Sequence, residues 1–114
     1  MTTIYHNPRC SKSRLTLELL HNNDIEPTVV EYLKTPLSQT EINTLIDQLD
    51  IDAIQLVRVK EAEFKEAGLT KSSTREAIVE AIANYPKLLE RPVVVHNNRA
   101  AIGRPPENVL ELFK

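Results

Sequence analysis

Apolar and polar positions along the chain follow two different periods, and each period predicts a different kind of element. Short runs rich in β-branched residues predict strands at 3–5, 28–32 and 92–96. Asn97-Asn98 predicts a tight hairpin turn, because Asn tolerates the positive φ angles that two-residue turns require. Residues 99–102 are then expected to return as an antiparallel strand.

Helical spacing accounts for the rest of the pattern. A helix is expected over 11–21, with Leu15, Leu19 and Leu20 on one face, and a last helix begins after Pro105-Pro106.

The middle of the chain is helical as well. Ser38-x-x-Glu41 and Ser73-x-x-Glu76 have the form of capping boxes, in which each side chain satisfies a free backbone N–H. Shorter helical pieces are expected in the region 51–64.

The order of these elements is β-α-β, then helices, then β-β-α. The first two strands should pair in parallel, and the terminal hairpin should extend the same sheet. This order predicts an α/β protein with a thioredoxin-like fold, a mixed sheet and a helical insertion at about 33–90. A length of 114 residues fits a single domain, 1–114.

Composition excludes several classes of function. The chain holds 14 Lys+Arg against 16 Asp+Glu, a net charge of -2, so a globally basic nucleic-acid binder is excluded. No apolar run approaches the roughly 20 residues that cross a bilayer, and no secretory signal is visible. The single cysteine suits a reducing compartment. We therefore expect a cytoplasmic monomer without a nucleic-acid or membrane partner.

The charges are distributed unevenly. Segments 1–17 and 91–106 contain no Asp or Glu, whereas 18–90 holds 14 acids against 7 bases. The basic residues of the two acid-free segments are Arg9, Lys12, Arg14, Arg91, Arg99 and Arg104. If the predicted fold brings these segments together across one cleft, they would attract a small anion. The alternative is that acid-free windows arise by chance in a short chain.

Cys10 lies directly before the first predicted helix. The helix dipole and the neighbouring basic residues favour a thiolate there, which is a nucleophile, and the free N–H groups of the first turn can hold an oxyanion. Ser13 stands where a Cys-x-x-Cys motif has its second cysteine, so it could donate a hydrogen bond to Cys10, but no internal disulfide relay can form. Any redox cycle therefore needs an external thiol. The alternative for Cys10 is a small buried hydrophobe.

Other residues near Cys10 leave alternatives open. The spacing from Cys10 to Arg14 is too short for the loop of a cysteine phosphatase. His6 could brace the loop or be a partly exposed turn residue. Three scattered histidines make a metal site improbable, and none is predicted. Arg91-Pro92 suggests a cis-proline that turns the backbone toward the Cys10 loop, with an ordinary trans proline as the alternative.

Several segments together resemble the ArsC family, the glutaredoxin-coupled arsenate reductases. They are His6-Asn7-Pro8-Arg9-Cys10-Ser11-Lys12-Ser13-Arg14, Tyr32-Leu33-Lys34-Thr35-Pro36, Arg58 with the segment 60–69, Glu90-Arg91-Pro92-Val93-Val94-Val95 and Gly103-Arg104-Pro105. The resemblance extends over nearly the whole chain in order and spacing. It implies a thioredoxin-like fold with a helical insertion.

The resemblance also implies an activity and a site. In that family a single cysteine attacks arsenate and three arginines hold the oxyanion, which here match Cys10, Arg58, Arg91 and Arg104. The loop His and Ser match His6 and Ser13. Glutathione as co-substrate and glutaredoxin as partner are implied, with no bound cofactor.

The chain departs from the well-studied reductases at Arg9, Ser11 and Lys12, which replace smaller and less basic residues, and it lacks their longer tail. These departures leave two rivals. One is a glutathione-dependent thiol reductase of the same fold. The other is a regulator that binds RNA polymerase, similar to Spx, although Ser13 breaks the Cys-x-x-Cys of many such proteins.

Overall fold

The computed structural model describes residues 1–114, which divide into two units. The first unit contains Met1–Thr35 and Arg91–Lys114, and the second contains the intervening Pro36–Glu90. The helical insertion predicted at about 33–90 therefore corresponds closely to the second unit. No helix in the chain is both long and apolar enough to span a bilayer.

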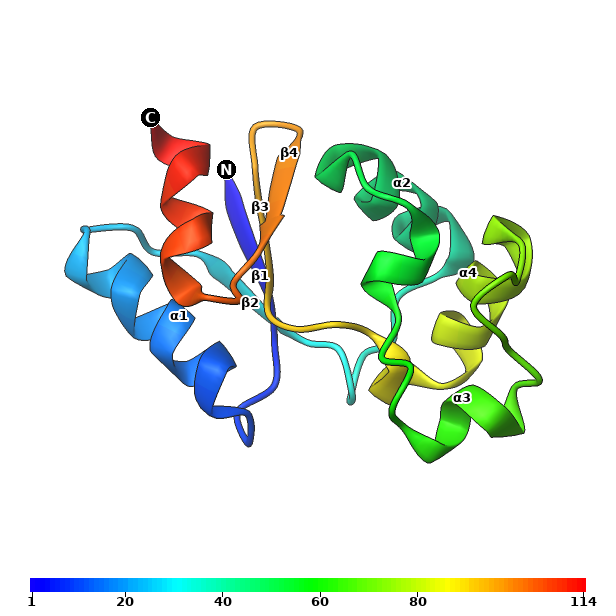
Figure 1. Ribbon diagram of the computed structural model, residues 1–114. Helices are drawn as coiled ribbons and strands as arrows, with labels where there is room; N and C mark the ends of the chain where they lie inside the picture. Colours follow the sequence, from blue (N-terminus) through cyan, green and yellow to red (C-terminus); the bar gives the residue numbers. More distant parts are fainter. The chain divides into compact units, whose positions relative to one another are not determined.

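A four-stranded mixed sheet forms the frame of the first unit (Figure 1). Its strands are β1 (Thr2–His6), β2 (Thr28–Glu31), β3 (Val93–His96) and β4 (Arg99–Ile102), arranged in the order β2-β1-β3-β4. β1 pairs with β2 in parallel, and the other pairs are antiparallel. The predicted α/β, thioredoxin-like arrangement is confirmed, as is the Asn97-Asn98 turn, where both φ angles are positive.

Two helical segments of the first unit pack on the sheet and contact each other. They are α1 (Ser11–Asn22) and the 3-10 segment η3 (Pro106–Phe113), the red helix of Figure 1. Their shared core with the sheet consists of Ile4, Leu20, Val94, Val109 and Leu112. Burial of this apolar surface is the main force holding the helices against the sheet.

The face that α1 buries differs from the predicted one. Ser13, Thr16 and Leu20 are buried, whereas Leu15 is 50% exposed and Leu19 is half-buried, so the expectation of one apolar face is wrong for Leu15. The two hydroxyl side chains tolerate burial because each has a hydrogen-bond partner. Their small size also lets the backbone of α1 approach a neighbouring segment of the same chain closely.

The second unit is helical. It contains α2 (Gln39–Leu49), η1 (Ala53–Leu56), α3 (Ala62–Glu66), α4 (Arg75–Asn84) and η2 (Pro86–Leu88). The first capping box is confirmed: Ser38 Oγ accepts from the Glu41 N–H at 3.1 Å, and Glu41 Oε1 accepts from the Ser38 N–H at 2.9 Å.

The second predicted capping box is wrong by one residue. Thr74 is the N-cap of α4, and its Oγ1 accepts from the Ala77 N–H at 3.2 Å. Ser73 Oγ instead accepts from the Thr70 N–H at 2.8 Å. Ser and Thr are comparable caps, so the pattern could not decide between neighbouring hydroxyl residues.

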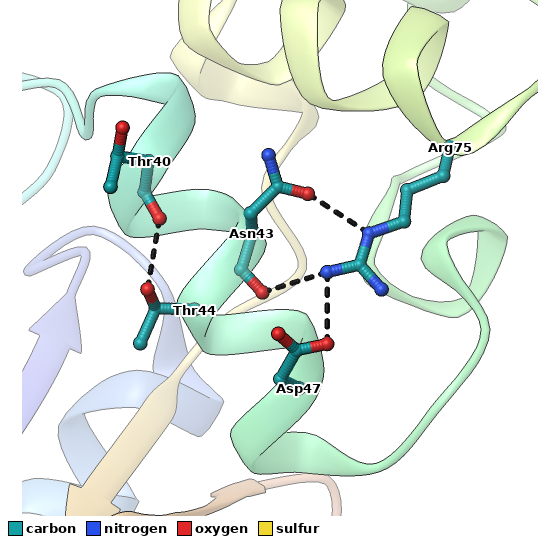
Figure 2. Close-up of polar contacts among 5 residues, drawn as sticks. All are labelled: Thr40, Asn43, Thr44, Asp47 and Arg75. Carbon is teal, nitrogen blue, oxygen red and sulfur yellow. Dashed lines mark hydrogen bonds and ion pairs between the residues drawn. The ribbon is translucent and has the colours of Figure 1, made fainter.

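Arg75 ties α4 to α2 within the second unit (Figure 2). Its Nε donates to Asn43 Oδ1 at 2.9 Å, and its Nη2 donates to the Asn43 carbonyl at 2.9 Å and to Asp47 Oδ1 at 3.0 Å. The planar guanidinium makes these bonds from one rigid group, which fixes the two helices to each other on their polar side.

Candidate functional site

Cys10 is the N-cap residue of α1, as the sequence predicted. Its backbone is extended, with φ -92° and ψ 123°, and the residue is half-buried, so it is not the fully buried hydrophobe of the alternative. Its N–H donates to the Asn7 carbonyl at 3.0 Å, and its own carbonyl accepts from the Arg14 N–H at 3.0 Å. The first turn of α1 contains no acidic residue. The free N–H groups at this terminus and the dipole of the 12-residue helix both favour a bound anion.

His6 and Ser13 brace the loop before Cys10 from inside. His6 is buried at the end of β1, and its Nδ1 lies 2.6 Å from Ser13 Oγ. The same hydroxyl oxygen accepts from the Asn7 N–H at 3.0 Å. The bracing role for His6 therefore agrees with the structure and the exposed-turn alternative does not. Ser13, predicted as a partner of Cys10, is bonded to His6 and Asn7.

The surroundings of His6 favour its neutral form. Burial lowers its pKa below the ordinary value of 6.5, and the positive charge of Arg14 lowers it further, while Glu31 acts in the opposite direction. A neutral imidazole with its proton on Nε2 can accept at Nδ1 from the Ser13 hydroxyl. That hydroxyl then keeps a lone pair for the Asn7 N–H, so the network is satisfied.

Arg91 and Arg104 come together at the start of β3. The β1–β3 register pairs Tyr5 with Val93, which places the beginning of β3 beside the end of β1, where the Cys10 loop starts. The Arg91–Pro92 peptide bond is cis, which confirms the prediction. Arg104 Nη1 donates to the Arg91 carbonyl at 3.1 Å. Arg104–Pro105 is also cis, which the sequence analysis did not predict.

Gly103 joins this pair of arginines to α1. Its N–H donates to the Pro92 carbonyl at 2.9 Å. A Cβ at this position would lie 2.6 Å from Thr16 Oγ1 and 2.8 Å from Pro92 Cγ, so only glycine allows this approach. The resemblance included Gly103 without a role for it, and sequence reasoning missed Thr16. The available signal was that Gly103 is one of only two glycines in the chain.

One predicted basic residue of the first unit, Arg99, lies away from the Cys10 loop. Arg99 pairs with His96 beside the hairpin turn, and His96 pairs with Thr2 at the beginning of β1. The expectation that all basic residues of 91–106 face the Cys10 loop is therefore wrong for Arg99, because the antiparallel hairpin carries it to the opposite end of the sheet.

Arg58 belongs to the second unit. Its N–H donates to the Leu88 carbonyl at 2.7 Å, and its Nη1 lies 2.8 Å from Glu61 Oε1. Both groups are partly buried, so the guanidinium is held in a defined local position. Its part in holding an anion with the other arginines stays a prediction.

The fold and this site define a thioredoxin-like α/β protein with one half-buried cysteine at a helix N-terminus and an arginine pair whose neighbour Gly103 packs closely against Thr16 of the same helix. Residues 5–112 match the ArsC family, and the chain belongs to that family.

Individual relatives agree with this assignment. An uncharacterized protein of Escherichia coli, YfgD, is 52% identical over 111 residues, covering 96% of this chain and 93% of that protein. A Neisseria meningitidis protein named arsenate reductase is 44% identical over 108 residues, covering 93% and 92%. The solved structure of an arsenate reductase from Vibrio cholerae is 47% identical, with a TM-score of 0.93 over 97% of this chain and 96% of that one.

Proposed function

We propose that this protein reduces arsenate to arsenite, with Cys10 as the nucleophile. The observation that carries the proposal is the N-cap position of Cys10 on a helix against which Gly103 holds the Arg91–Pro92 and Arg104 segment. This arrangement supports a nucleophile and cations that act from one frame. Relatives named arsenate reductase support arsenate as the oxyanion.

Arsenate binds through its oxygen atoms. Arg91 and Arg104 donate to the oxyanion together with the free N–H groups of α1, and Arg58 supplies a third guanidinium. A planar guanidinium can bond two oxygens of one oxyanion at once, which a lysine cannot do. Donors fixed before the reaction stabilise the charge that shifts onto oxygen in the transition state.

The first chemical step forms a sulfur–arsenic bond. The Cys10 thiolate attacks arsenic(V) of HAsO₄²⁻, one proton is taken up, and one arsenate oxygen leaves as water. The product is a Cys10–S–AsO₃²⁻ adduct in which arsenic is still pentavalent. No electron has been transferred to arsenic at this stage.

Reduction requires a second thiol, and the chain has only one cysteine. Glutathione supplies it: its sulfur attacks Cys10 Sγ, and the electron pair of the sulfur–arsenic bond passes to arsenic, which leaves as arsenite. The two sulfurs lose two electrons and become a Cys10–glutathione disulfide. Glutaredoxin then removes the glutathionyl group by thiol–disulfide exchange and restores the thiolate. No bound cofactor takes part.

The test is arsenate-dependent NADPH oxidation coupled through glutaredoxin, glutathione and glutathione reductase. Cys10→Ser should abolish turnover and leave the circular dichroism spectrum unchanged, since Cys10 is only half-buried. Mass spectrometry of the parent protein, quenched without glutaredoxin, should show one glutathionyl group on Cys10. Arsenite formation by Cys10→Ser would remove this residue from the mechanism.

A second assay distinguishes arsenate reduction from the alternative function, a thiol reductase of the same fold, which a single cysteine could also perform. A glutathionylated peptide replaces arsenate in the same coupled assay. If kcat/KM is higher for the peptide than for arsenate, the protein is a thiol reductase and arsenate is not its main substrate. Phosphate, which has nearly the same shape as arsenate, should inhibit competitively without supporting NADPH oxidation.

A further inference from the structure

The loop that presents Cys10 is closed on its inner side by hydrogen bonds of Asn7. The Asn7 carbonyl accepts from the Cys10 N–H, and Asn7 Oδ1 accepts from the Arg9 N–H, both at 3.0 Å. The Asn7 N–H in turn donates to Ser13 Oγ at 3.0 Å. One side of the loop is thus fastened to the buried face of α1.

The outer side of the loop is fastened by Arg14. Pro8 is exposed and has no N–H, so its carbonyl is the one main-chain polar group by which this residue can be held. Arg14 Nη1 donates to that carbonyl at 2.9 Å. The Arg14 N–H donates to the Cys10 carbonyl at 3.0 Å. Arg14 therefore bonds to one carbonyl that precedes the Cys10 Cα atom and to one that follows it.

We propose that Arg14 is a positioning residue that clamps Pro8 to α1 and so holds Cys10 at the N-cap, and that it is not an oxyanion ligand. The absence of acidic residues around Cys10 suggests that all the basic side chains nearby help to bind the anion. The structure gives Arg14 a different partner, the Pro8 carbonyl. The catalytic consequence of this clamp depends on the proposed arsenate reduction, but the clamp itself does not.

The charge of Arg14 provides a second, independent signature. Burial is the main cause that lowers the pKa of His6, Arg14 lowers it further, and Glu31, the partner of His6 in the β1–β2 register, raises it. Removing the positive charge should therefore raise the pKa of His6. An unmoved titration would show that the Arg14 charge does not act on His6, whereas the clamp itself is tested by the exchange measurement.

Three variants separate these roles. Arg14→Met removes the clamp and the charge but keeps an aliphatic chain of similar reach. Arg14→Lys keeps the charge and replaces the fixed guanidinium by a flexible ammonium. Arg99→Met is the matched control, because Arg99 is exposed at the opposite end of the sheet.

The readouts are amide hydrogen exchange at Cys10, NMR titration of the His6 ring and steady-state kinetics with arsenate. For Arg14→Met we expect about fivefold faster exchange at Cys10, the change that accompanies loss of one hydrogen bond of ordinary net strength. We also expect a raised His6 pKa and a kcat about tenfold lower, since small displacements of a nucleophile are costly, with KM within about twofold. Arg14→Lys should exchange at an intermediate rate with the His6 titration unchanged, and Arg99→Met should match the parent protein throughout.

Unchanged exchange at Cys10 in Arg14→Met would overturn the clamp. A raised KM for arsenate with unchanged kcat would also overturn it, and would make Arg14 an oxyanion ligand. Failure of the parent protein to reduce arsenate would refute the proposed function alone. The exchange measurement would still decide the clamp, because it does not need turnover.

Discussion

Gly103→Ala should destabilise the protein through steric overlap alone. The added Cβ would lie 2.6 Å from Thr16 Oγ1, 2.8 Å from Pro92 Cγ and 3.1 Å from Thr16 Cγ2. Ordinary contacts between such atoms are about 3.5–4.0 Å, so the neighbours must retreat by roughly 1 Å. Gly103 does not have a positive φ, so alanine adds no backbone strain of the left-handed kind.

The size of the effect follows from what surrounds the added methyl group. Thr16 has no exposed surface and Pro92 is buried, so neither can move into solvent. Overpacking of a buried site costs about 1–3 kcal/mol, and two rigid obstacles place this case near 2–3 kcal/mol. Urea unfolding should show a midpoint lowered by about 1 M. KM for arsenate should rise as well, because Pro92 follows Arg91 in the chain.

A double-mutant cycle tests the cause of this loss. Thr16→Ala removes two of the three overlapping atoms, so Gly103→Ala should cost about 1 kcal/mol less in that background. Gly68→Ala is the control: its φ is 73° and a Cβ there meets nothing within 4 Å, so it should lose about 1 kcal/mol through backbone conformation only. If Gly103→Ala and Thr16→Ala are additive within about 0.5 kcal/mol, steric contact between them is refuted.

Three further predictions concern the site and the helix caps. Arg91→Lys keeps the charge but loses the planar fork, so KM for arsenate should rise about tenfold; unchanged KM and kcat would contradict oxyanion binding by Arg91. Because the pKa of His6 lies below 6.5 in the folded protein, the unfolded chain binds more protons in acid, and the free energy of unfolding should fall as pH drops below 6.5. His6→Gln should weaken this fall below pH 6.5, and an identical slope in both proteins would exclude His6 as its source. Thr74→Ala should cost about 1 kcal/mol in urea unfolding and Ser73→Ala less, whereas a larger loss for Ser73→Ala would return the α4 cap to the predicted position.

Much of the candidate site is local in the sequence and was predictable. Cys10 follows a strand and precedes a helix in the pattern, and the structure places it at the N-cap. The bracing role of His6 and the cis bond before Pro92 were among the stated alternatives. Each of these features depends on neighbouring residues and on turn or cap chemistry, which a pattern of residue types reports directly.

The contacts that assemble the site were not predictable in this way. The charge pattern alone does not distinguish Arg104, bonded to the Arg91 carbonyl, from Arg99, which the hairpin carries to the other end of the sheet; only the family resemblance separated them. Nor does the pattern show that Gly103 touches both Thr16 and Pro92. These contacts join residues many positions apart, and their geometry depends on strand register and on the close approach of backbones.

The residue pattern was sufficient for the identity of the elements, the mixed sheet and the lone cysteine before α1, because strand periodicity, turn chemistry and the number of thiols are properties of the chain itself. Which face of α1 is buried, where the Arg14 guanidinium is bonded and which arginines meet were decided by folding. Burial depends on what packs against a surface, so Ser13 became a core residue and Leu15 remained half exposed. Hydrogen-bonded hydroxyls and a missing Cβ let α1 approach the backbone at Gly103, an outcome that no count of apolar positions contains.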